Sequence, residues 1–417
     1  MDAKPSLGEH PGLVVSILCT SVAAGAYEIV PSSTAPLLAD QLGATPVQVS
    51  WLVSVMLGVA VVGSLPAGAI VDRFGVLGSV ALATAVFVVG GAVSWYFAAR
   101  GAYWPVLWSR AVAGFGFVLL WNTGLTAVGQ FRNAATATGL YTASGPVGFA
   151  LGHVTGPAIA TAFAPQAVFL VYPLLLVPAT VGVAAFWPAD LERGGSGELP
   201  SAGEFAAVAR NRSVLLVCLL GFVSYSLYLF VNSWVPTYLN SRLTLSLAES
   251  GALTALFPLL GAASRASGGV VTDRLFAGRA RPVVVVSLVA SGVALTGVML
   301  SSTYLLLAGF LLVGGYFVQL SLGVFYGVVP ATVDDDHVTT AVALLTTSAC
   351  SARSPRRCSP AKPSRRPGRT RRRSATASRS PPSASSSRYA GSTCERGVAV
   401  TTRATCSLLG ACRNRRI

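Results

Sequence analysis

Long apolar runs recur along most of this sequence, and each is about as long as a helix that crosses a membrane. A membrane-spanning helix needs about 20 consecutive apolar residues to cover the hydrocarbon of the bilayer. Such runs occupy residues 13–38, 50–71, 78–98, 104–128, 135–162, 166–188, 213–238, 249–271, 282–301 and 303–330, and a shorter one covers 338–349. The sequence therefore predicts an all-α polytopic membrane protein with ten complete transmembrane helices and the stub of an eleventh.

The composition excludes a soluble globular protein and a disordered one. Only 11% of the 417 residues are charged and 53% are hydrophobic, whereas a soluble domain carries roughly 25% charged residues. The sequence contains no His-Glu-x-x-His and no Gly-x-x-x-x-Gly-Lys-Ser/Thr pattern, so neither a metalloprotease nor a nucleotide-driven pump is indicated. Asp334–His337 is interpreted as a solvated loop and the acidic first turn of a helix rather than a metal site. We expect no enzyme, no cofactor and no metal.

Charge divides the chain into two parts of different character. Residues 1–348 hold 13 Lys/Arg and 14 Asp/Glu, a net charge of −1, whereas residues 349–417 hold 17 Lys/Arg and one acid, a net charge of +16. No part of 351–389, with 12 Lys/Arg and no acid, could span a bilayer. We favour a slip of the reading frame near Ser348–Cys350, because out-of-frame GC-rich codons tend to encode Arg, Ser, Pro, Ala and Cys. The alternative is a basic cytoplasmic tail that binds anionic lipid or nucleic acid.

The basic residues of the loops predict the orientation. With the N-terminus inside, the predicted inside loops hold nine Lys/Arg and the predicted outside loops hold two. Cytoplasmic loops carry the excess of Lys/Arg in membrane proteins. A cytoplasmic N-terminus in a multi-pass protein of the plasma membrane is therefore expected.

One motif occurs twice, half a chain apart. Gly68-Ala-Ile-Val-Asp72-Arg73 ends the second predicted span, and Gly269-Val-Val-Thr-Asp273-Arg274 ends the eighth, 201 residues later. Matched copies at matched positions predict two similar halves in parallel orientation, as some transporters have. The predicted organisation is a six-helix bundle (1–189), a cytoplasmic linker (190–212), an incomplete second bundle (213–349) and an Arg/Ser/Pro-rich tail (350–417), which we expect to be disordered.

Four segments resemble the major facilitator superfamily (MFS). They are the loop motif Gly68–Gly75, the Arg-x-x-x-Gly-x-Gly pattern from Arg110 to Gly116, the series Gly148-x-x-x-Gly152-x-x-x-Gly156-Pro157 found in proton-coupled exporters, and Asn232-Ser-Trp-Val-Pro236. The loop motif departs from the family after Gly75, where Val76 and Leu77 replace a basic pair. The resemblance implies the MFS fold of two six-helix bundles, the second truncated here, which alternate access to a central site.

Glu28 is the most informative single residue. It lies in the middle of the first apolar run, where a charge costs about 3 kcal/mol or more and therefore indicates a functional site. Ser21, Gly25, Glu28 and Ser32 share one face of the predicted helix, which we expect to line a wet cavity. Glu28 is accordingly predicted to carry a proton or bind the solute. The alternative is a structural partner for Arg110.

Other polar residues within the spans are candidates for the proton or solute site. Arg110 is expected to tune a proton site or bind an anion, or else to extend to the outer interface. Arg265 is also expected to bind an anion. The alternative is an arginine at the inner interface that pairs with Asp273. His153 is a candidate proton relay or a hydrogen-bonded core histidine. Asn122, Tyr225, Tyr228, Asn232 and Gln319 face the cavity or make hydrogen bonds between helices.

The resemblance assigns two further groups of residues. Gly68, Asp72, Arg73, Gly75, Asp273 and Arg274 form the gating motif, which in the family latches one bundle to the other; the alternative is a set of ordinary interfacial charges. The glycines of the fifth span, Gly148, Gly152 and Gly156, with Pro157, are expected to provide a flat groove for close helix packing.

The function expected from these observations is secondary active transport of a small solute, coupled to protons. A second hypothesis is a permease that takes up or exchanges a small anion through Arg110 and Arg265. A third is a membrane protein that does not transport and whose basic tail binds lipid or nucleic acid. The expected partners are the solute, the proton and the lipid bilayer, without nucleic acid, and the protein is expected to be a monomer.

Overall fold

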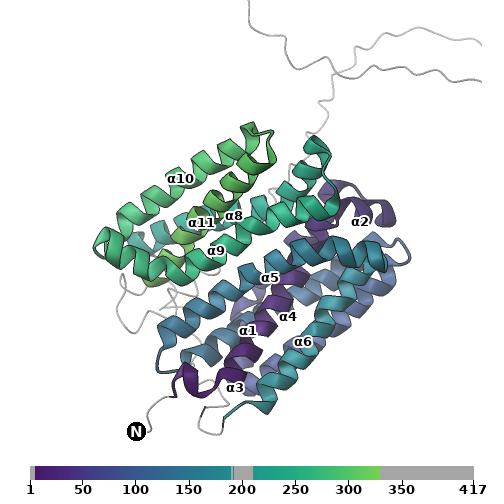
Figure 1. Ribbon diagram of the computed structural model, residues 1–417. Helices are drawn as coiled ribbons and strands as arrows, with labels where there is room; N and C mark the ends of the chain where they lie inside the picture. The colour runs from purple at the N-terminus through teal and green to yellow at the C-terminus, as the bar shows by residue number, and fades with distance from the viewer. Residues whose placement is uncertain (1–4, 189–190, 192–209, 329–417) are drawn as a thin grey trace, which may run out of the picture. The chain divides into compact units, whose positions relative to one another are not determined.

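Long helices make up most of the chain that the structure describes. The computed structural model describes residues 5–188, 191 and 210–328. Its helices are α1 (Pro11–Ser33), α2 (Ala35–Leu42), α3 (Pro46–Ala98), α4 (Tyr103–Gly129), α5 (Ala134–Ala162), α6 (Val168–Ala185), α8 (Arg212–Leu243), α9 (Leu247–Phe276), α10 (Ala280–Leu300) and α11 (Tyr304–Val328), with single 3₁₀ turns at Leu7–Glu9 and Pro165–Ala167 (Figure 1). The all-α fold is confirmed for these residues.

Nine segments of the described chain are long and apolar enough to cross a membrane. The fifth predicted span, 135–162, is not among these nine: it forms the helix α5, but its Gly, Ser and Thr residues lower its mean hydropathy. The stub at 338–349 and the tail 350–417 lie outside the described residues, as does most of the linker 190–212.

The structure corrects the first two predicted boundaries. The span predicted at 13–38 is not one helix: α1 ends at Ser33 and α2 begins at Ala35, because Pro36 in the first turn of α2 has no N–H to continue the helix. The spans predicted at 50–71 and 78–98 both fall within α3, which is interrupted at Gly75 (φ 67°, ψ −179°). Only glycine adopts this backbone region readily, so Gly75 fixes the position of the break.

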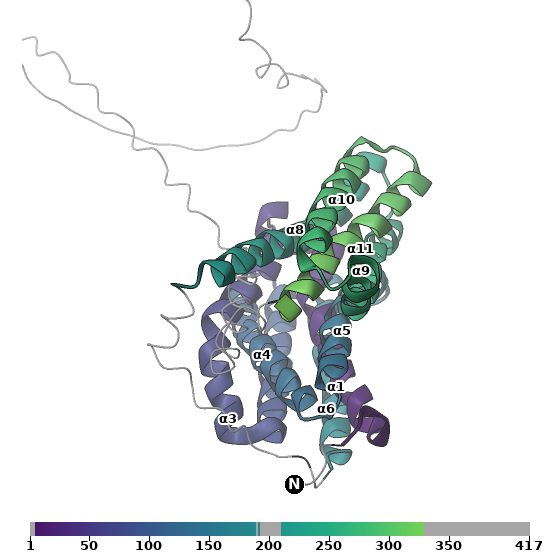
Figure 2. The same cartoon turned by 90° about the vertical axis from the view of Figure 1, so that its left-hand side faces the viewer.

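Within the described residues, helices of the second half repeat helices of the first. Three helices begin 201 residues after a counterpart in the first half: α8 after α1, α9 after α3 and α11 after α4. The capping boxes that start α3 (Thr45 with Gln48) and α9 (Ser246 with Glu249) are also 201 residues apart. In the first half α4 packs against α3, and in the second α11 packs against α9 and α10 (Figures 1 and 2). The repeat predicted from one motif therefore extends over whole helices.

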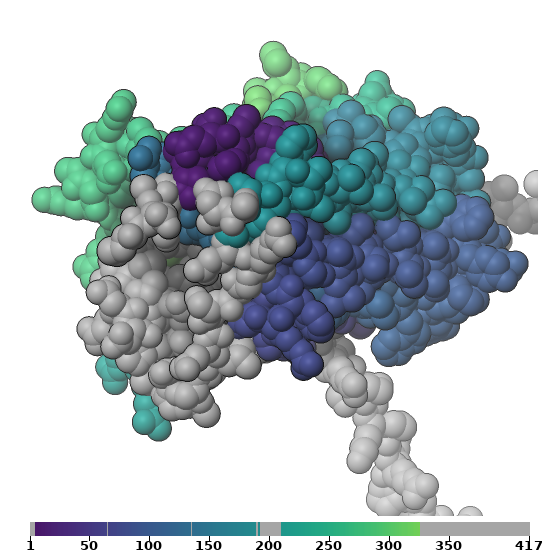
Figure 3. All heavy atoms as spheres, turned by 90° about the horizontal axis from the view of Figure 1, so that it is seen from below, coloured from purple at the N-terminus to yellow at the C-terminus, as the bar shows by residue number. Residues whose placement is uncertain are grey.

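Contacts between the halves centre on α5 and α9, with a smaller contact between α1 and α8. One buried apolar cluster includes Ile29 and Phe149 from the first half together with Tyr228, Leu253 and Phe257 from the second. Within the first half, the start of α1 lies against the end of α6 (Figure 3), where a Cβ atom on Gly12 would lie 2.9 Å from the Phe186 ring. The helix α1 is thus packed inside its own half and also reaches the other.

Candidate functional site

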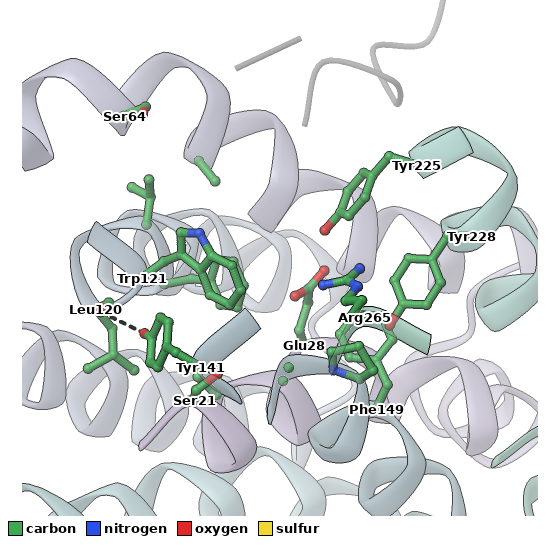
Figure 4. A pocket seen from close by; sticks show the side chains of 17 residues that line it. Ser21, Glu28, Ser64, Leu120, Trp121, Tyr141, Phe149, Tyr225, Tyr228 and Arg265 are labelled. Carbon is green, nitrogen blue, oxygen red and sulfur yellow. Dashed lines mark hydrogen bonds between the residues drawn. The ribbon is translucent and has the colours of Figure 1, made fainter. Parts of the chain in front are cut away.

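A cavity lies where α1, α3, α4 and α5 meet α8 and α9 (Figure 4). The centre of a water molecule can move through about 60 Å³ of it. The lining residues are Ser21, Ala24, Gly25, Glu28, Ala60, Ser64, Phe117, Val118, Leu120, Trp121, Tyr141, Gly145, Pro146, Phe149, Tyr225, Tyr228 and Arg265. The cavity wall is therefore mostly aromatic and apolar, with one carboxylate and one guanidinium.

Helical spacing predicts that four residues of α1 face a cavity, and three of the four line this one. Ser21, Gly25 and Glu28 line it, and Glu28 is fully buried. Ser32 does not line it, and its hydroxyl donates to the carbonyl oxygen of Ile29 at 2.6 Å. Thus α1 supplies the carboxylate at the level of the cavity, one turn before its proline.

Arg265 brings a positive charge to the cavity from α9. Its Nη1 donates to the carbonyl oxygen of Thr142 in α5 at 3.0 Å, and its guanidinium carbon lies 5.4 Å from the centre of the Tyr228 ring. Figure 4 shows the Glu28 carboxylate and the Arg265 guanidinium pointing toward one another. The interpretation of Arg265 as a partner of Asp273 is wrong: Asp273 is exposed and about 12 Å further along the helix.

Arg110 is fully buried and does not line the cavity, so its extension to the outer interface is also wrong. Its Nε donates to the carbonyl oxygen of Leu52 at 2.8 Å, Nη1 to that of Tyr27 at 2.9 Å and Nη2 to that of Glu28 at 2.8 Å. Pro31 has no N–H to offer the Tyr27 carbonyl in the usual helical bond, and Arg110 replaces that donor. Arg110 therefore joins α4 to α1 and α3 and holds the backbone that carries Glu28.

His153 and Asn232 connect α5 to α8 outside the cavity lining. Both are buried, and His153 Nε2 lies 3.2 Å from Asn232 Oδ1. Asn232 Nδ2 donates to the carbonyl oxygen of Tyr228 at 2.8 Å. Beside them a Cβ atom on Gly251 of α9 would collide with the carbonyl oxygen of His153 and lie 3.4 Å from Pro157. The two halves therefore touch closely here, toward the C-terminal end of α5.

The remaining polar candidates divide between the cavity and the packing. Tyr225 and Tyr228 line the cavity. Asn122 lies outside the lining and donates from Nδ2 to the carbonyl oxygen of Ser64 at 3.1 Å, which links α4 to α3. Gln319 is buried against Gly261, away from the cavity.

Sequence reasoning did not single out most of the aromatic wall. Phe117 and Trp121 from α4 stack with ring centres 6.2 Å apart, and Trp121 lies 5.1 Å from Tyr141 of α5. Phe149 stacks on Tyr228 at 5.3 Å. A signal was present, since Phe117 and Trp121 are four residues apart on one helix face, as are Tyr141, Gly145 and Phe149.

The 201-residue repeat pairs positions across the cavity. Arg265 corresponds to Ser64, and both line the cavity. Glu28 and Arg110 correspond to Leu229 and Leu311, which are buried leucines. The second half thus builds the equivalent helices without either charge, so neither charge is needed to form such a helix.

The residues of the gating motif lie away from the cavity. Asp72 is half-buried, the guanidinium carbon of Arg73 lies 5.7 Å from the Phe74 ring centre, and Asp273 and Arg274 are exposed in the last turn of α9. Gly68 has open space beside it, because a Cβ atom there would meet nothing within 4 Å. The second copy ends differently from the first: α9 stops at Phe276, and Ala277 and Gly278 have positive φ.

The glycine series of α5 faces α1. A Cβ atom on Gly152 would lie 2.8 Å from the carbonyl oxygen of Ala26, and one on Gly156 would lie 2.8 Å from the hydroxyl of Ser33. A Cβ atom on Gly148 would collide with the carbonyl oxygen of Val22. Pro157 lies within the continuous helix α5. The groove therefore joins two helices of the first half and positions α1 against the cavity.

No group of three or more His, Cys, Asp or Glu side chains that could hold a metal ion occurs among the described residues.

A family profile and two solved structures are similar to this chain. The sequence profile of the Major Facilitator Superfamily matches residues 16–354. A bacterial homologue of the human lysosomal transporter Spinster, in an inward-facing and unoccupied conformation, superposes with a TM-score of 0.65 at 14% identity, covering 81% of this chain and 79% of that one. The same homologue in an inward-facing and occupied conformation gives 0.59 at 15% identity, covering 81% and 78%. A comparison with curated protein sequences gives no match.

Proposed function

The chain belongs to the Major Facilitator Superfamily, and we propose that it is a proton-coupled secondary transporter of one small solute that works by alternating access. The multi-pass protein is proposed to lie in the plasma membrane as a monomer, with its N-terminus in the cytoplasm. The cavity between the two halves is the proposed solute site. Glu28 is the proposed proton carrier.

The observation that carries this proposal is the position of Glu28. Its side chain is fully buried in the middle of a transmembrane helix and lines the cavity. A carboxylate is costly in such a place and marks proton or ion pathways in transporters. The equivalent residue of the second half is Leu229, which argues against a purely structural need for a carboxylate.

Alternating access requires one side of the cavity to close while the other opens. The close contact of Gly251 with His153, beside the His153–Asn232 pair, is the proposed closed side in this conformation. With a cytoplasmic N-terminus this is the outer side, which gives an inward-facing state like that of the superposed Spinster homologue. Asp72, Arg73, Asp273 and Arg274, with Gly68 and Gly75, are proposed to gate the opposite side.

Arg110 has a positioning role in this proposal. Its three bonds to main-chain carbonyls hold α1 and do not leave its guanidinium facing the cavity. The hypothesis of two arginines that bind an anion together is therefore reduced to Arg265 alone. The hypothesis of a non-transporting protein with a basic tail depends on 350–417, which lies outside the described residues.

Uptake by proteoliposomes that contain the full chain tests the proposal. A screen of labelled small solutes with an inward-directed pH gradient is expected to find one that accumulates. Glu28→Gln is expected to abolish accumulation driven by the gradient while it preserves exchange of solute at equal concentrations. Asp40→Asn, at an exposed carboxylate far from the cavity, is the matched control and should change neither. Unchanged gradient-driven accumulation in Glu28→Gln would remove Glu28 as the proton carrier.

A further inference from the structure

We infer that the cavity takes a small organic anion with a flat apolar body, whose acidic head group binds Arg265 and whose body lies among the rings around Trp121. This inference rests on the proposed function, because it treats the cavity as the solute site. It adds the chemical class of the solute and the orientation in which the solute lies.

The first argument is charge. Among the described residues, three charged side chains lie well inside the transmembrane helices close to the cavity: Glu28, Arg110 and Arg265. Two guanidinium groups against one carboxylate leave the region positive. Arg110 is committed to three main-chain carbonyls, so Arg265 is the cation that faces the cavity. A cationic solute would have to bind beside the Arg265 guanidinium, which disfavours it.

The second argument is unmet hydrogen-bonding capacity at the same end. Arg265 Nη1 donates to Thr142, but its buried Nε has no hydrogen-bond partner among the residues that the structure describes. The guanidinium lies over the Tyr228 ring, and the buried hydroxyl of Tyr228 also lacks a hydrogen-bond partner within the described chain. Buried donors of this kind favour an acceptor, and a planar or tetrahedral oxyanion suits the fork of an arginine.

The third argument is the opposite end of the cavity. Figure 4 shows Trp121, Tyr141 and Ser64 at one end, and Glu28, Arg265 and Tyr228 at the other. The Tyr141 hydroxyl already donates to the carbonyl oxygen of Leu120 at 3.2 Å, so this end presents mainly ring faces, with the Ser21 and Ser64 hydroxyls and the Trp121 N–H as its neutral polar groups. Phe117, stacked on Trp121, extends the apolar surface. Aromatic rings pack well against a flat apolar group.

Other classes of solute fit less well. A sugar would bring many hydroxyl groups to a wall with few polar atoms. A neutral apolar molecule would leave Arg265 Nε and the Tyr228 hydroxyl unmatched. An inorganic anion would satisfy Arg265 but not occupy the aromatic end. The amphipathic organic anion is the class that uses both ends.

Three probes separate the head from the body. Benzenesulfonate has a permanent negative charge and a ring, methanesulfonate has the charge without the ring, and benzamidinium has the ring with a positive charge. A ligand that binds the folded protein raises its unfolding temperature in a manner set by its concentration relative to Kd. With the purified full chain in detergent, benzenesulfonate is expected to raise the unfolding temperature and to bind at least tenfold more tightly than either other probe.

Variants assign each end. Arg265→Gln is expected to weaken benzenesulfonate binding at least tenfold, and Arg265→Lys less, since it keeps the charge but loses the fork. Trp121→Ala is expected to weaken the binding of benzenesulfonate until its affinity is close to that of methanesulfonate. Arg242→Gln, at an exposed arginine, and Trp108→Ala, at a tryptophan exposed on α4, are matched controls that should bind as the parent does. Unfolding temperatures without ligand show whether each variant folds.

Several outcomes would overturn the inference. Tighter binding of benzamidinium that is lost in Glu28→Gln would make the cavity a cation site. Equal binding of both sulfonates by the parent would contradict a role for the aromatic rings in binding the body of the solute. If benzenesulfonate did not raise the unfolding temperature, the assignment of an anionic solute would be wrong. The proposed function fails separately: anion binding can persist while Glu28→Gln leaves gradient-driven uptake unchanged. Conversely, gradient-driven uptake of a cation that depends on Glu28 would support the proposed proton-coupled transport but contradict the inference of an anionic solute.

Discussion

The Nη2 atom of Arg110 donates a hydrogen bond of 2.8 Å to the main-chain carbonyl oxygen of Glu28, the residue whose side chain lines the cavity. The neighbouring carbonyl, that of Tyr27, is the one that Pro31 leaves without its helical donor, and Arg110 also satisfies it. In the second half Asn232 stands at the position of Pro31 and keeps its main-chain N–H, and its side chain also donates to the equivalent carbonyl, that of Tyr228. The need that Arg110 meets in the first half therefore comes from Pro31 and is absent from the second half.

Arg110→Leu is expected to destabilise the protein. The change removes three buried hydrogen bonds and leaves the Tyr27 carbonyl without a donor, at a cost on the order of 2–4 kcal/mol in the free energy of unfolding. Arg110→Lys should lose less, because an ammonium group can still reach one carbonyl. Thermal unfolding of the detergent-purified chain measures both. Arg242→Lys, at an exposed position, is the control, and equal stability of Arg110→Leu and parent would contradict a joining role for Arg110.

Gly152→Ala is expected to lower stability, although Ala ordinarily favours a helix over Gly. The new Cβ atom would lie 2.8 Å from the carbonyl oxygen of Ala26 and 2.9 Å from a methyl of Ile29, so α1 and α5 must separate, at a cost of about 1–3 kcal/mol. Gly139→Ala in the same helix is the matched control: its Cβ atom meets nothing within 4 Å, and stability should rise by up to about 1 kcal/mol. The same sign for both changes would reject the close α1–α5 contact.

Gly75 and Gly68 belong to the same motif but are expected to respond differently. Gly75→Ala places a side chain at φ 67° and ψ −179°, which costs roughly 1–3 kcal/mol. Gly68→Ala has open space around it and should be neutral or slightly stabilising. Chemical denaturation of the two variants in one detergent gives the comparison. A larger loss at Gly68 than at Gly75 would mean that Gly68 is packed in the dominant state.

The nucleotide sequence across residues 348–350 is expected to continue in another frame with two apolar runs. The 201-residue offset places them near 336–363 and 367–389, the counterparts of the fifth and sixth spans. The family match ends at residue 354, close to the change in composition. Sequencing the gene from a fresh sample decides the matter. Two frames without such runs would favour a basic tail that belongs to the protein.

The helices were predictable from the sequence because an apolar run of sufficient length in a membrane has few alternatives to a helix. The repeat was predictable because Asp72-Arg73 and Asp273-Arg274 stand out in apolar surroundings. The inward face of α1 followed from helical spacing around Glu28. Only Ser32 departed from it, since α1 ends within two residues of this position and its hydroxyl turns back to the helix.

The aromatic wall and the roles of the arginines were not predictable from local sequence. Trp121 and Phe149 look like any lipid-facing aromatic residue until the neighbouring helices are placed. Arg110 and Arg265 are both single arginines in apolar runs, yet one meets three carbonyls and the other meets the cavity. Which helix lies opposite a given side chain is a tertiary property, and helical spacing does not contain it.

The cavity combines a duplicated framework with an unduplicated set of charges. Because Arg265 faces the cavity where the other half has Ser64, the two ends of the site are matched in backbone and unlike in chemistry. A molecule with identical ends, such as a linear dicarboxylate, would find a cationic partner at one end and none at the other. We expect the site to discriminate against symmetrical molecules and to bind an asymmetric molecule in one orientation only.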